Sequence, residues 1–550
     1  MVYPLLKSLV KRIHSMKRQQ SVMKHQFSQV PKAEIQRSSF DRSHGLKTTF
    51  DGGFLYPIFC DEALPGDSFN LSMTGFARLA TPIFPIMDNM RMETFFFAVP
   101  NRLLWDNWQK FNGEQTNPGD STDFTVPQLV AQGPYDDSTI FDYIGLPIGV
   151  GNLTYSAFWL RAYNLIWNEW FRDQNMQDSV TVHTGDTGDL SADYELLRRG
   201  KRHDYFTSCL PWPQKGDPVS IPISGSAPVT GIGSGEIPLG GAKGNVAQTG
   251  GITSNFANSW NPKYDAAVLV NGQIVMEEDP NNPGFPGIYA DLSAATTITI
   301  NELREAFQIQ RLLERDARGG TRYIEIIKAH FGVTSPDARL QRPEYLGGGS
   351  SVVNISPIAS TVPTSLPNNP TPQGNLAAVG TSTLHNHGFT KSFTEHCTII
   401  GLVSVRADLT YQQGLPRMFS RETRYDFYWP ALSHLGEQAV LNQEIFHNGD
   451  PVNDTAVFGY QERYAEYRYK PSQITGKMRS AAVGTLDAWH LSQDFADLPV
   501  LGSEFIQDNP PLDRIVAVPS EPKFIFDGYF NLRCARPMPL YGVPGLIDHF

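Results

Sequence analysis

The sequence predicts a mainly β fold, on three observations. The 550 residues include 47 glycines and 40 prolines, a composition that favours short strands joined by long, turn-rich loops over a helical bundle. Only 18% of the residues are charged, below the roughly 25% that is usual for soluble domains. Strand-like patterns occur near both ends of the chain, which suggests one sheet system closed by partners distant in sequence.

Three segments carry the strand patterns. Arg91–Val99 is rich in β-forming residues and is followed by Pro100, which cannot continue a strand ladder. Thr398–Val405 is a nearly continuous apolar run, as expected for a strand buried on both faces. Lys523–Cys534 alternates apolar and polar residues, and Gly528 in its middle indicates a bulge or a close backbone approach. The residues expected on its buried face are Phe524, Phe526, Phe530 and Leu532.

Two segments between these strands predict helices, Ala157–Gln174 and Glu302–Arg318. The second has Asn301 as a good N-cap and ends at Gly319–Gly320. Each segment has an apolar stripe at helical spacing, which we expect to face the protein core rather than a cofactor. The stripes consist of Leu160, Tyr163, Ile166, Trp167 and Trp170, and of Leu303, Ala306, Phe307, Gln310 and Leu313.

Cysteines and apolar runs indicate an origin in the cytosol. Cys60, Cys209, Cys397 and Cys534 are far apart in sequence, so they predict buried thiols in a reducing compartment rather than a zinc site or a disulfide framework. No apolar run approaches the ~18 residues that a membrane span needs. The apolar run at the start of the chain is too short, and too interrupted by other residues, to predict a signal peptide.

Charge divides the chain into two unequal parts. Residues 1–50 contain ten Lys and Arg against two acidic residues, so this arm has a net charge of +8, whereas the whole chain has −11. Residues 1–15 could form a weak amphipathic helix, and Met16 is a second plausible start, followed by polar sequence that should not fold alone. A basic arm on an acidic body predicts a polyanionic partner on one side. The alternative is a solvated, unstructured terminus.

The arm supplies the candidate DNA-contacting residues. Its basic residues are interleaved with His25, Phe27 and Phe40, so it could neutralise several phosphates while its rings stack on unpaired bases. The pattern carries no information on base sequence. The candidates are Lys17, Arg18, Lys24, Lys32, Arg37, Arg42 and Lys47.

Two later segments are nearly uncharged. Ile221–Trp260 contains only Glu236 and Lys243 as charged residues, and Tyr345–Thr390 contains no charged residue in 46 positions. Disordered tails are usually charged, so we expect these segments to be loops ordered against neighbours, including other copies of the chain. Flexible neutral linkers are the alternative.

The sequence motifs of known catalytic and metal sites do not predict an enzyme for this chain. The chain has no G-x-S-x-G or H-E-x-x-H motif, and its Gly-Lys pairs lack the first glycine of a phosphate-binding loop. His385, His387 and His396 could share a metal, but a hydrogen-bonding role is favoured because no carboxylate is nearer than Glu395. The acids Asp193, Glu195 and Asp204 lie among arginines and lysines, which favours a salt-bridged surface. We therefore expect no catalytic residue, no metal and no cofactor.

Five long blocks, in this order, resemble the major capsid protein family of the Microviridae, in particular the gokushovirus branch of small tailless phages with circular single-stranded DNA. They are spread between residues 27 and 348, and each is long and specific. The blocks are FSQVPKAEIQRSSFDRSHGLKTTFD (Phe27–Asp51), LPGDSFNLSMTGFARLATPIFPIMDNMRMETFFFAVPNRLLWDNWQKFNGEQ (Leu64–Gln115), RAYNLIWNEWFRDQN (Arg161–Asn175), KRHDYFTSCLPWPQKGDPV (Lys201–Val219) and RYIEIIKAHFGVTSPDARLQRPEYLGG (Arg322–Gly348).

The resemblance implies an eight-stranded antiparallel jelly roll of the viral capsid type, with residues 51–550 as one domain that carries long loop insertions. It implies that pentamers and finally sixty copies build a T=1 shell around the genome, assembled in the host bacterial cytoplasm. Residues 220–286 would be the variable insertion that protrudes at each threefold axis, and residues 345–390 another surface or inter-subunit loop. Further implied partners are viral single-stranded DNA, a small basic DNA-binding viral protein and a host cell-surface receptor.

Two points stay open on the sequence. Members of the family often begin near the MKRQ sequence at Met16, so residues 1–15 are an extension, a wrongly assigned start or a true upstream segment. A large β-rich glycan-binding or glycan-active protein would share the abundant Gly, Pro and aromatic residues. That alternative predicts a signal peptide and a paired-carboxylate or aromatic platform, and neither is evident in the sequence.

Overall fold

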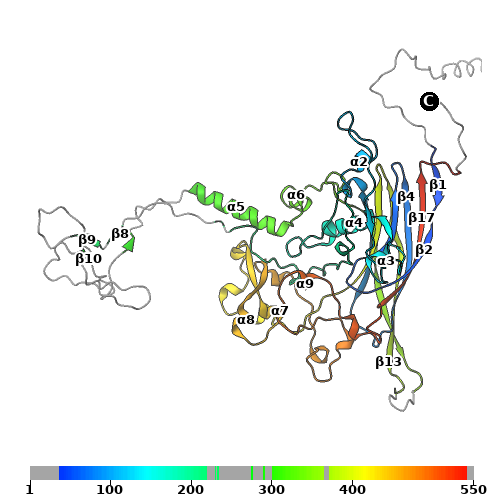
Figure 1. The fold of residues 1–550 in the computed structure, drawn as a ribbon. Coiled ribbons are helices and arrows are strands. Elements are labelled where there is room, and N and C mark those ends of the chain that lie inside the picture. Colours follow the sequence, from blue (N-terminus) through cyan, green and yellow to red (C-terminus); the bar gives the residue numbers. More distant parts are fainter. Residues whose placement is uncertain are drawn as a thin grey trace, which may run out of the picture.

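One curled antiparallel sheet dominates the computed structural model (Figure 1). The structure describes residues 36–217, 219, 300–363 and 371–541, together with four short strands between residues 229 and 290. The expected N-terminal helix, the second start at Met16 and the candidates Lys17, Arg18, Lys24 and Lys32 lie outside the described residues, as does most of the expected insertion at 220–286.

The sheet contains nine of the described strands in eight positions, because β1 and β2 follow one another along the same side of β17. The order is β1-β17-β4-β13-β12-β5-β14-β3, and every pairing is antiparallel. This mainly β architecture confirms the expected fold class and is consistent with a jelly roll. The strands are β1 (Ser38–Asp41), β2 (His44–Phe50), β3 (Tyr56–Ala63), β4 (Ser68–Leu79), β5 (Met90–Pro100), β12 (Glu344–Ala359), β13 (Leu376–Ser392), β14 (Cys397–Ala407) and β17 (Phe524–Arg536).

The three strands predicted from the sequence are present. β5 includes Pro100 as its last residue, opposite Cys397, where a missing N–H ends the ladder. β14 is buried along nearly its whole length, as its apolar run predicts. β17 alternates buried and exposed residues with the predicted phenylalanines inside. Its Gly528 is a site of close approach rather than a bulge, because a Cβ there would press against the ring of Phe526.

The end of the expected basic arm belongs to the sheet. Residues 38–50 form β1 and β2, and both pair with β17 at the opposite end of the chain. The physical reason is that this stretch has apolar residues to bury once β17 is beside it: Phe50 lies in the core and Leu46 packs against it. Isolated, the same residues would have no such partner.

Most of the expected neutral loop at 345–390 is strand. β12 and β13 form a long hairpin. In the part nearer the sheet, β12 also pairs with β5 and β13 also pairs with β4. The absence of charge therefore does not mark a loop, because the segment forms paired strands of mixed burial, in which Val353 is the only buried residue of β12. From Asn354 to Ala359, β12 pairs only with β13, so the end of the hairpin extends beyond the sheet (Figure 1).

Helices cover one face of the sheet. α4 (Phe158–Ile166) and a following π-helical turn (Trp167–Phe171) match the helix predicted over 157–174, and Leu160, Tyr163 and Ile166 are buried as expected. They pack against residues of β5 and β14, while phenylalanines on the other face of the sheet form a second core. β14 is thus buried from both sides.

α5 (Ile300–Gly319) confirms the second predicted helix, but its stripe does not face the core. Of its residues only Ala317 is buried, and Leu303 and Phe307 are exposed. The expectation of a core-facing stripe is therefore wrong for this helix. α5 reaches away from the sheet, beside α6 (Tyr323–Phe331), so its first turns have no other part of the described chain to pack on (Figure 1).

The remaining elements are short. Within the insertion, β8 (Val229–Thr230) pairs with β11 (Tyr289–Ala290), and β9 (Ile232–Ser234) with β10 (Ile274–Met276). Among the described helices, none has the length and apolar character needed to cross a bilayer. The others are α2 (Trp108–Phe111), α3 (Ile140–Tyr143), α7 (Asn442–Ile445), α8 (Pro451–Thr455) and α9 (Ser503–Ile506), with β6 (Gln128–Val130) paired to β7 (Thr154–Ser156) and β15 (Glu437–Leu441) paired to β16 (Val457–Glu462).

Candidate nucleic-acid interface and shell surfaces

Three candidate DNA-contacting residues are described, and all three have partners in the same chain. Arg37 donates to Ser68 Oγ at 3.0 Å, beside the start of β4. Arg42 Nη1 lies 2.6 Å from Asp61 Oδ2, and Lys47 Nζ lies 2.9 Å from Asp527 Oδ1. These ion pairs connect the end of the arm to the sheet. Their charge is thereby partly neutralised.

Arg42 is the most tightly held of the three. Partial burial alone would lower its pKa, but the hydrogen bond and charge of Asp61 raise the pKa above its usual value. Lys47 and Asp527 are both largely exposed, so their pair is weak. Phe40, one of the rings expected to stack on bases, lies in β1 opposite Cys534 and is only partly exposed.

The three candidate histidines do not form a metal site. A bulge in β13 between Leu384 and His387 leaves His385 exposed and His387 buried. The Nδ1 of His387 is 2.9 Å from Thr94 Oγ1, and its Nε2 is 3.3 Å from Ser351 Oγ. Burial lowers the pKa of His387. His396 packs edge-on against Trp108, and the described residues contain no cluster of three or more metal-ligating side chains.

The charged stretch around residues 193–204 is an internal network as much as a surface. Glu93 on β5 accepts from Arg199 at 2.5 Å and from Arg406 at 2.8 Å. Burial lowers the pKa of Arg199 to about 10 and that of Lys201 to about 8. Arg199 holds the segment against β5, whereas Lys201 donates to Gln493 and lies over the ring of Phe505. The expected salt bridges exist, but part of the network is buried beneath the surface.

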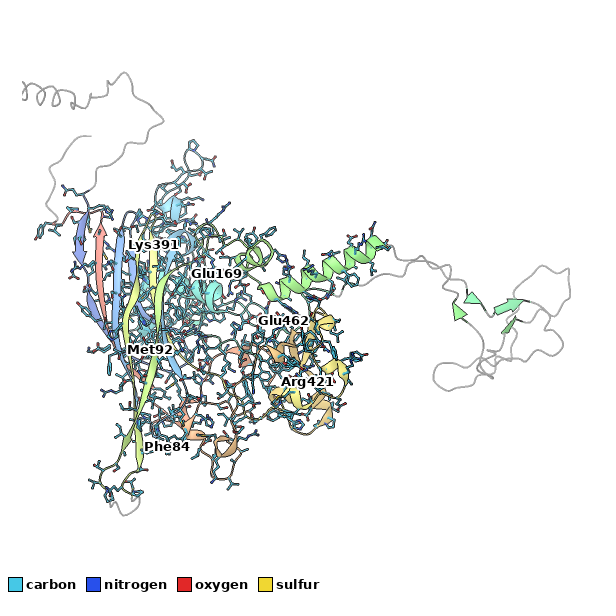
Figure 2. All side chains as sticks on the ribbon, turned by 180° about the vertical axis from the view of Figure 1, so that it is seen from behind. Phe84, Met92, Glu169, Lys391, Arg421 and Glu462 are labelled. Atoms are coloured by element: carbon cyan, nitrogen blue, oxygen red, sulfur yellow. The ribbon has the colours of Figure 1, made fainter. Side chains whose placement is uncertain are left out.

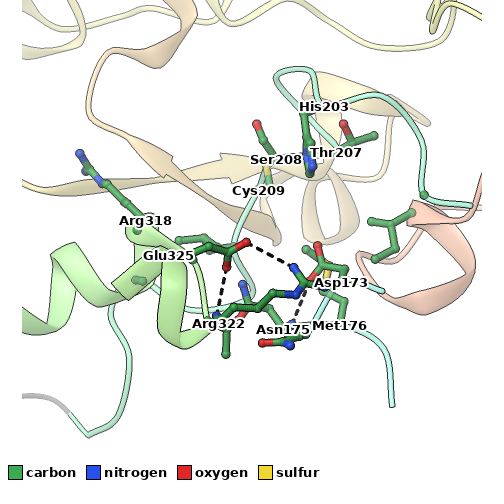
Figure 3. Close-up of a pocket in the computed structure, with 18 of the residues that line it drawn as sticks. Asp173, Asn175, Met176, His203, Thr207, Ser208, Cys209, Arg318, Arg322 and Glu325 are labelled. Atoms are coloured by element: carbon green, nitrogen blue, oxygen red, sulfur yellow. Dashed lines mark hydrogen bonds and ion pairs between the residues drawn. The ribbon is translucent and has the colours of Figure 1, made fainter. Parts of the chain in front are cut away.

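A cavity of about 890 Å³ lies between this segment and α5–α6 (Figure 3). Arg322 donates to Glu325 and to the carbonyl oxygen of Arg172, and the buried Nε atoms of Arg172 and Arg322 have no hydrogen-bond partner. Cys209 lines the cavity, but burial raises the pKa of its thiol, which is the opposite of what an activated nucleophile needs.

Exposed apolar side chains gather outside the sheet. One group lies on the loops that carry residues 417–432, where rings alternate with arginines: the Arg424 guanidinium lies over Trp429, and that of Arg421 over Tyr467. Aromatic residues and arginine are enriched at protein–protein interfaces. Sequence reasoning did not single out this segment, although the alternation in RMFSRETRYDFYWP is a visible signal. Its exposed apolar residues are Met418, Phe419, Tyr425, Phe427, Tyr428 and Trp429.

Comparison with known proteins decides between a shell protein and the alternatives. The family described as "Capsid protein (F protein)" matches residues 28–546. The chain belongs to this capsid protein family. Capsid protein VP1 of Chlamydia phage 1 is 48% identical, over 96% of this chain and 98% of the relative. VP1 of Bdellovibrio phage phiMH2K is 48% identical with the same coverage, and VP1 of Spiroplasma virus 4 is 37% identical over 95% and 97%.

These relatives confirm the expected membership in the gokushovirus branch of the Microviridae. The chain is a major capsid protein of a phage virion, structural rather than catalytic. Capsid proteins assemble into a multimeric shell. The apolar side chains that are exposed in this single chain therefore belong to a subunit that has neighbours in the shell. The glycan-protein alternative finds no support in the family.

Proposed function

We propose that sixty copies of the chain, grouped in pentamers, form a T=1 shell that encloses circular single-stranded DNA and touches it through the basic arm. The observation that carries the DNA contact is the charge division: residues 1–50 have a net charge of +8 on a chain of −11. A polycationic segment binds phosphates by releasing their counterions. The acidic remainder of the subunit disfavours binding of nucleic acid elsewhere.

Within the arm, the proposed roles differ between residues. Arg42 and Lys47 are paired with Asp61 and Asp527, so we assign them mainly to joining the arm to the sheet. Arg37 sits where the chain enters β1 and can still turn to a phosphate, because its guanidinium is exposed. The contact with DNA is assigned chiefly to Lys17, Arg18, Lys24 and Lys32, which precede the sheet in sequence.

Packaging measurements test this assignment. Replacing Lys17, Arg18, Lys24 and Lys32 together by Gln halves the net charge of the arm, and we expect fewer genomes per particle with unchanged folding. A matched control replaces four exposed cations of the body, Arg78, Lys110, Lys470 and Lys477, by Gln. Nuclease-protected genome copies per particle are counted by quantitative PCR. Normal DNA content in the arm variant, or an equal loss in the control, contradicts the proposal.

The two uncharged segments are proposed as contacts between copies. The end of the β12–β13 hairpin carries exposed Ile358 and Val362, has no charged residue and is paired only within itself. A two-stranded ribbon is marginally stable alone in water, which favours cover by a neighbouring subunit. The insertion at 220–286 is proposed as the threefold protrusion. Hydrogen exchange before and after assembly tests both, with new protection expected; unchanged exchange at 354–359 argues against the hairpin contact.

Further partners are proposed from the family resemblance alone. The modest charge of the arm favours a small basic viral protein that shares the neutralisation of DNA, and a host cell-surface receptor would bind the outside of the shell. Particles that contain DNA but only this one basic component would contradict the first of these.

A further inference from the structure

We propose that the subunit binds an aromatic anion of the nucleoside monophosphate class in a cavity that adjoins the one in Figure 3. This second cavity, called the ring cavity below, has a volume of about 370 Å³. Lys201 and His203 line both cavities. The volume is within the range of small-ligand sites, which begins at about 300 Å³. The inference adds a ligand site to the capsid function and does not depend on the DNA contact of the arm.

Aromatic side chains form half of the wall of the ring cavity. Five of its ten lining residues carry rings, which come from β5, from β12 and from the π-helical turn after α4. Figure 2 labels Met92 in β5 and Glu169 in that turn. The ring centroid of Tyr345 lies 5.5 Å from that of Phe97 and 5.9 Å from that of Trp170. A nucleobase can stack on such rings whatever its identity. The five are Phe95, Phe97, Trp170, Phe171 and Tyr345.

Burial differs between these rings, which gives the ring cavity a floor and a mouth. Phe97 is 1% exposed, whereas Tyr345 is 41% exposed. His203 is exposed as well. A planar group that enters beside Tyr345 and His203 therefore meets Phe97 at the floor.

The charged part of the wall is basic throughout. Among the described residues, no acidic side chain lines the ring cavity, and its lining residues without aromatic carbon rings are Arg199, Gly200, Lys201, His203 and Arg406. Glu93, which is not part of the lining, accepts from Arg199 at 2.5 Å and from Arg406 at 2.8 Å, so one carboxylate serves two arginines. Lys201 donates to the neutral side chain of Gln493 at 3.1 Å. The ring cavity is therefore a basic exception in an acidic subunit.

Burial makes this excess of positive charge costly. The side chains of Arg199 and Arg406 are only 11% and 13% exposed, so water and salt screen them little. Burial, and then the charge of Arg406, lowers the pKa of Arg199 to about 10, and burial lowers the pKa of Lys201 to about 8. Asp508 attracts both cations, but it does not line the cavity, and burial raises its own pKa to about 7. A bound anion would supply the missing negative charge.

Rings and cations together select the ligand. Inorganic phosphate would satisfy the cations and leave the rings uncovered, whereas a neutral aromatic molecule would do the reverse. A nucleoside monophosphate carries both parts in one molecule. A free nucleotide and one nucleotide of a DNA strand share this chemistry.

Calorimetric titration of the unassembled chain tests the ring cavity. Deoxyadenosine monophosphate should bind about tenfold or more tightly than inorganic phosphate or deoxyadenosine. Tyr345→Ala and His203→Glu should each weaken its binding about fivefold or more. Tyr529→Ala and His434→Glu change exposed residues of the same types elsewhere and should leave binding unchanged. Thermal unfolding shows that each variant folds. A folded parent chain that does not bind the nucleotide, or binds phosphate equally well, would overturn the proposal, as would equal losses in the controls.

Purified particles show whether the ligand is free or part of the genome. A free nucleotide is released when particles are denatured, and mass spectrometry of the small molecules should then find close to one copy for each chain. If the ligand belongs to the strand, no small nucleotide is released, and a single-stranded oligonucleotide displaces the monophosphate from the unassembled chain. Either result supports the site. Particles without small nucleotides, together with an oligonucleotide that does not compete, would overturn the inference while leaving the shell function intact.

Discussion

Arg161 and Asp189 form a two-pronged ion pair with no exposed surface on either side chain. Nε of Arg161 lies 2.8 Å from Oδ2 of Asp189, and Nη2 lies 2.6 Å from Oδ1. Arg161 comes from α4, and it also donates to the carbonyl oxygens of Leu104 and Gly185. The pair thus fastens two irregular segments to the helix that covers the sheet.

Removing one member of this pair should destabilise the subunit strongly. Arg161→Met leaves the Asp189 carboxylate buried without its cation, which costs about 3–5 kcal/mol of unfolding free energy. Urea denaturation of the unassembled chain measures it, with the exposed Lys110→Met as control. The double variant Arg161→Met, Asp189→Leu should recover part of the loss. A loss below about 1 kcal/mol for the single variant would contradict the role given to the pair.

A second prediction concerns a point where three neighbouring strands, β12, β13 and β4, lie close together. Gly388 of β13 pairs with Gly348 of β12, and a Cβ at Gly388 would overlap the carbonyl oxygen of Leu71 on β4. Gly388→Ala should therefore lower the unfolding free energy by about 1–3 kcal/mol. Gly133→Ala is the control, since no atom lies within 4 Å of its added Cβ. Equal stability of the two variants would show that the strands can move apart freely.

Because His387 is buried, the folded chain should lose stability in acid. Burial, and to a lesser extent the charge of His385, lowers the pKa of His387 in the folded chain. The unfolded chain then binds its proton first, so the stabilising contribution is complete above the unfolded value of about 6.5 and declines as the pH falls below it. Unfolding free energies at pH 7.5 and 5 measure this decline, which His387→Asn should reduce. An unchanged pH dependence in the variant would assign the effect to other groups.

Arg42 should matter for the sheet and not for the genome. Arg42→Gln removes the ion pair with Asp61, whose side chain is largely covered, while the arginine itself is partly exposed. The expected cost is about 0.5–1 kcal/mol, with nuclease-protected DNA per particle unchanged. Lys24→Gln is the comparison, with the opposite outcome for DNA and none for stability. A loss of DNA in the Arg42 variant that exceeds that of Lys24→Gln would place Arg42 at the genome.

Local patterns predicted the strands better than they predicted the partners of exposed elements. The apolar run at 398–405 and the alternation at 523–534 specify burial directly, and both strands are where the patterns indicate. The stripe of α5 is apolar in sequence, yet Leu303 and Phe307 are exposed in the described chain. An apolar stripe at helical spacing does not state what lies against it, so the sequence did not show that the first turns of α5 project away from the core.

The neutral composition of Tyr345–Thr390 did not distinguish a loop from paired strands. The segment forms most of β12 and β13, which pair with β5 and β4, and the same composition also occurs in loops. The end of the arm at 38–50 was assigned to the arm because its partner, β17, is almost 500 residues away in sequence. The Arg161–Asp189 pair was missed for a related reason, since a single arginine on an aromatic-rich helix does not reveal its acid.

The mass of the assembled particle reports directly how many copies of the chain form the shell. Sixty copies of the 61.3 kDa chain give a protein shell of about 3.7 MDa. Particles are purified from cells that make the chain together with the other proteins of the phage, emptied of DNA and weighed by charge-detection mass spectrometry. We expect a shell of this mass, with small additions from minor components. A chain that remains a 61.3 kDa monomer under every salt condition, or a closed shell of clearly different copy number, would contradict it.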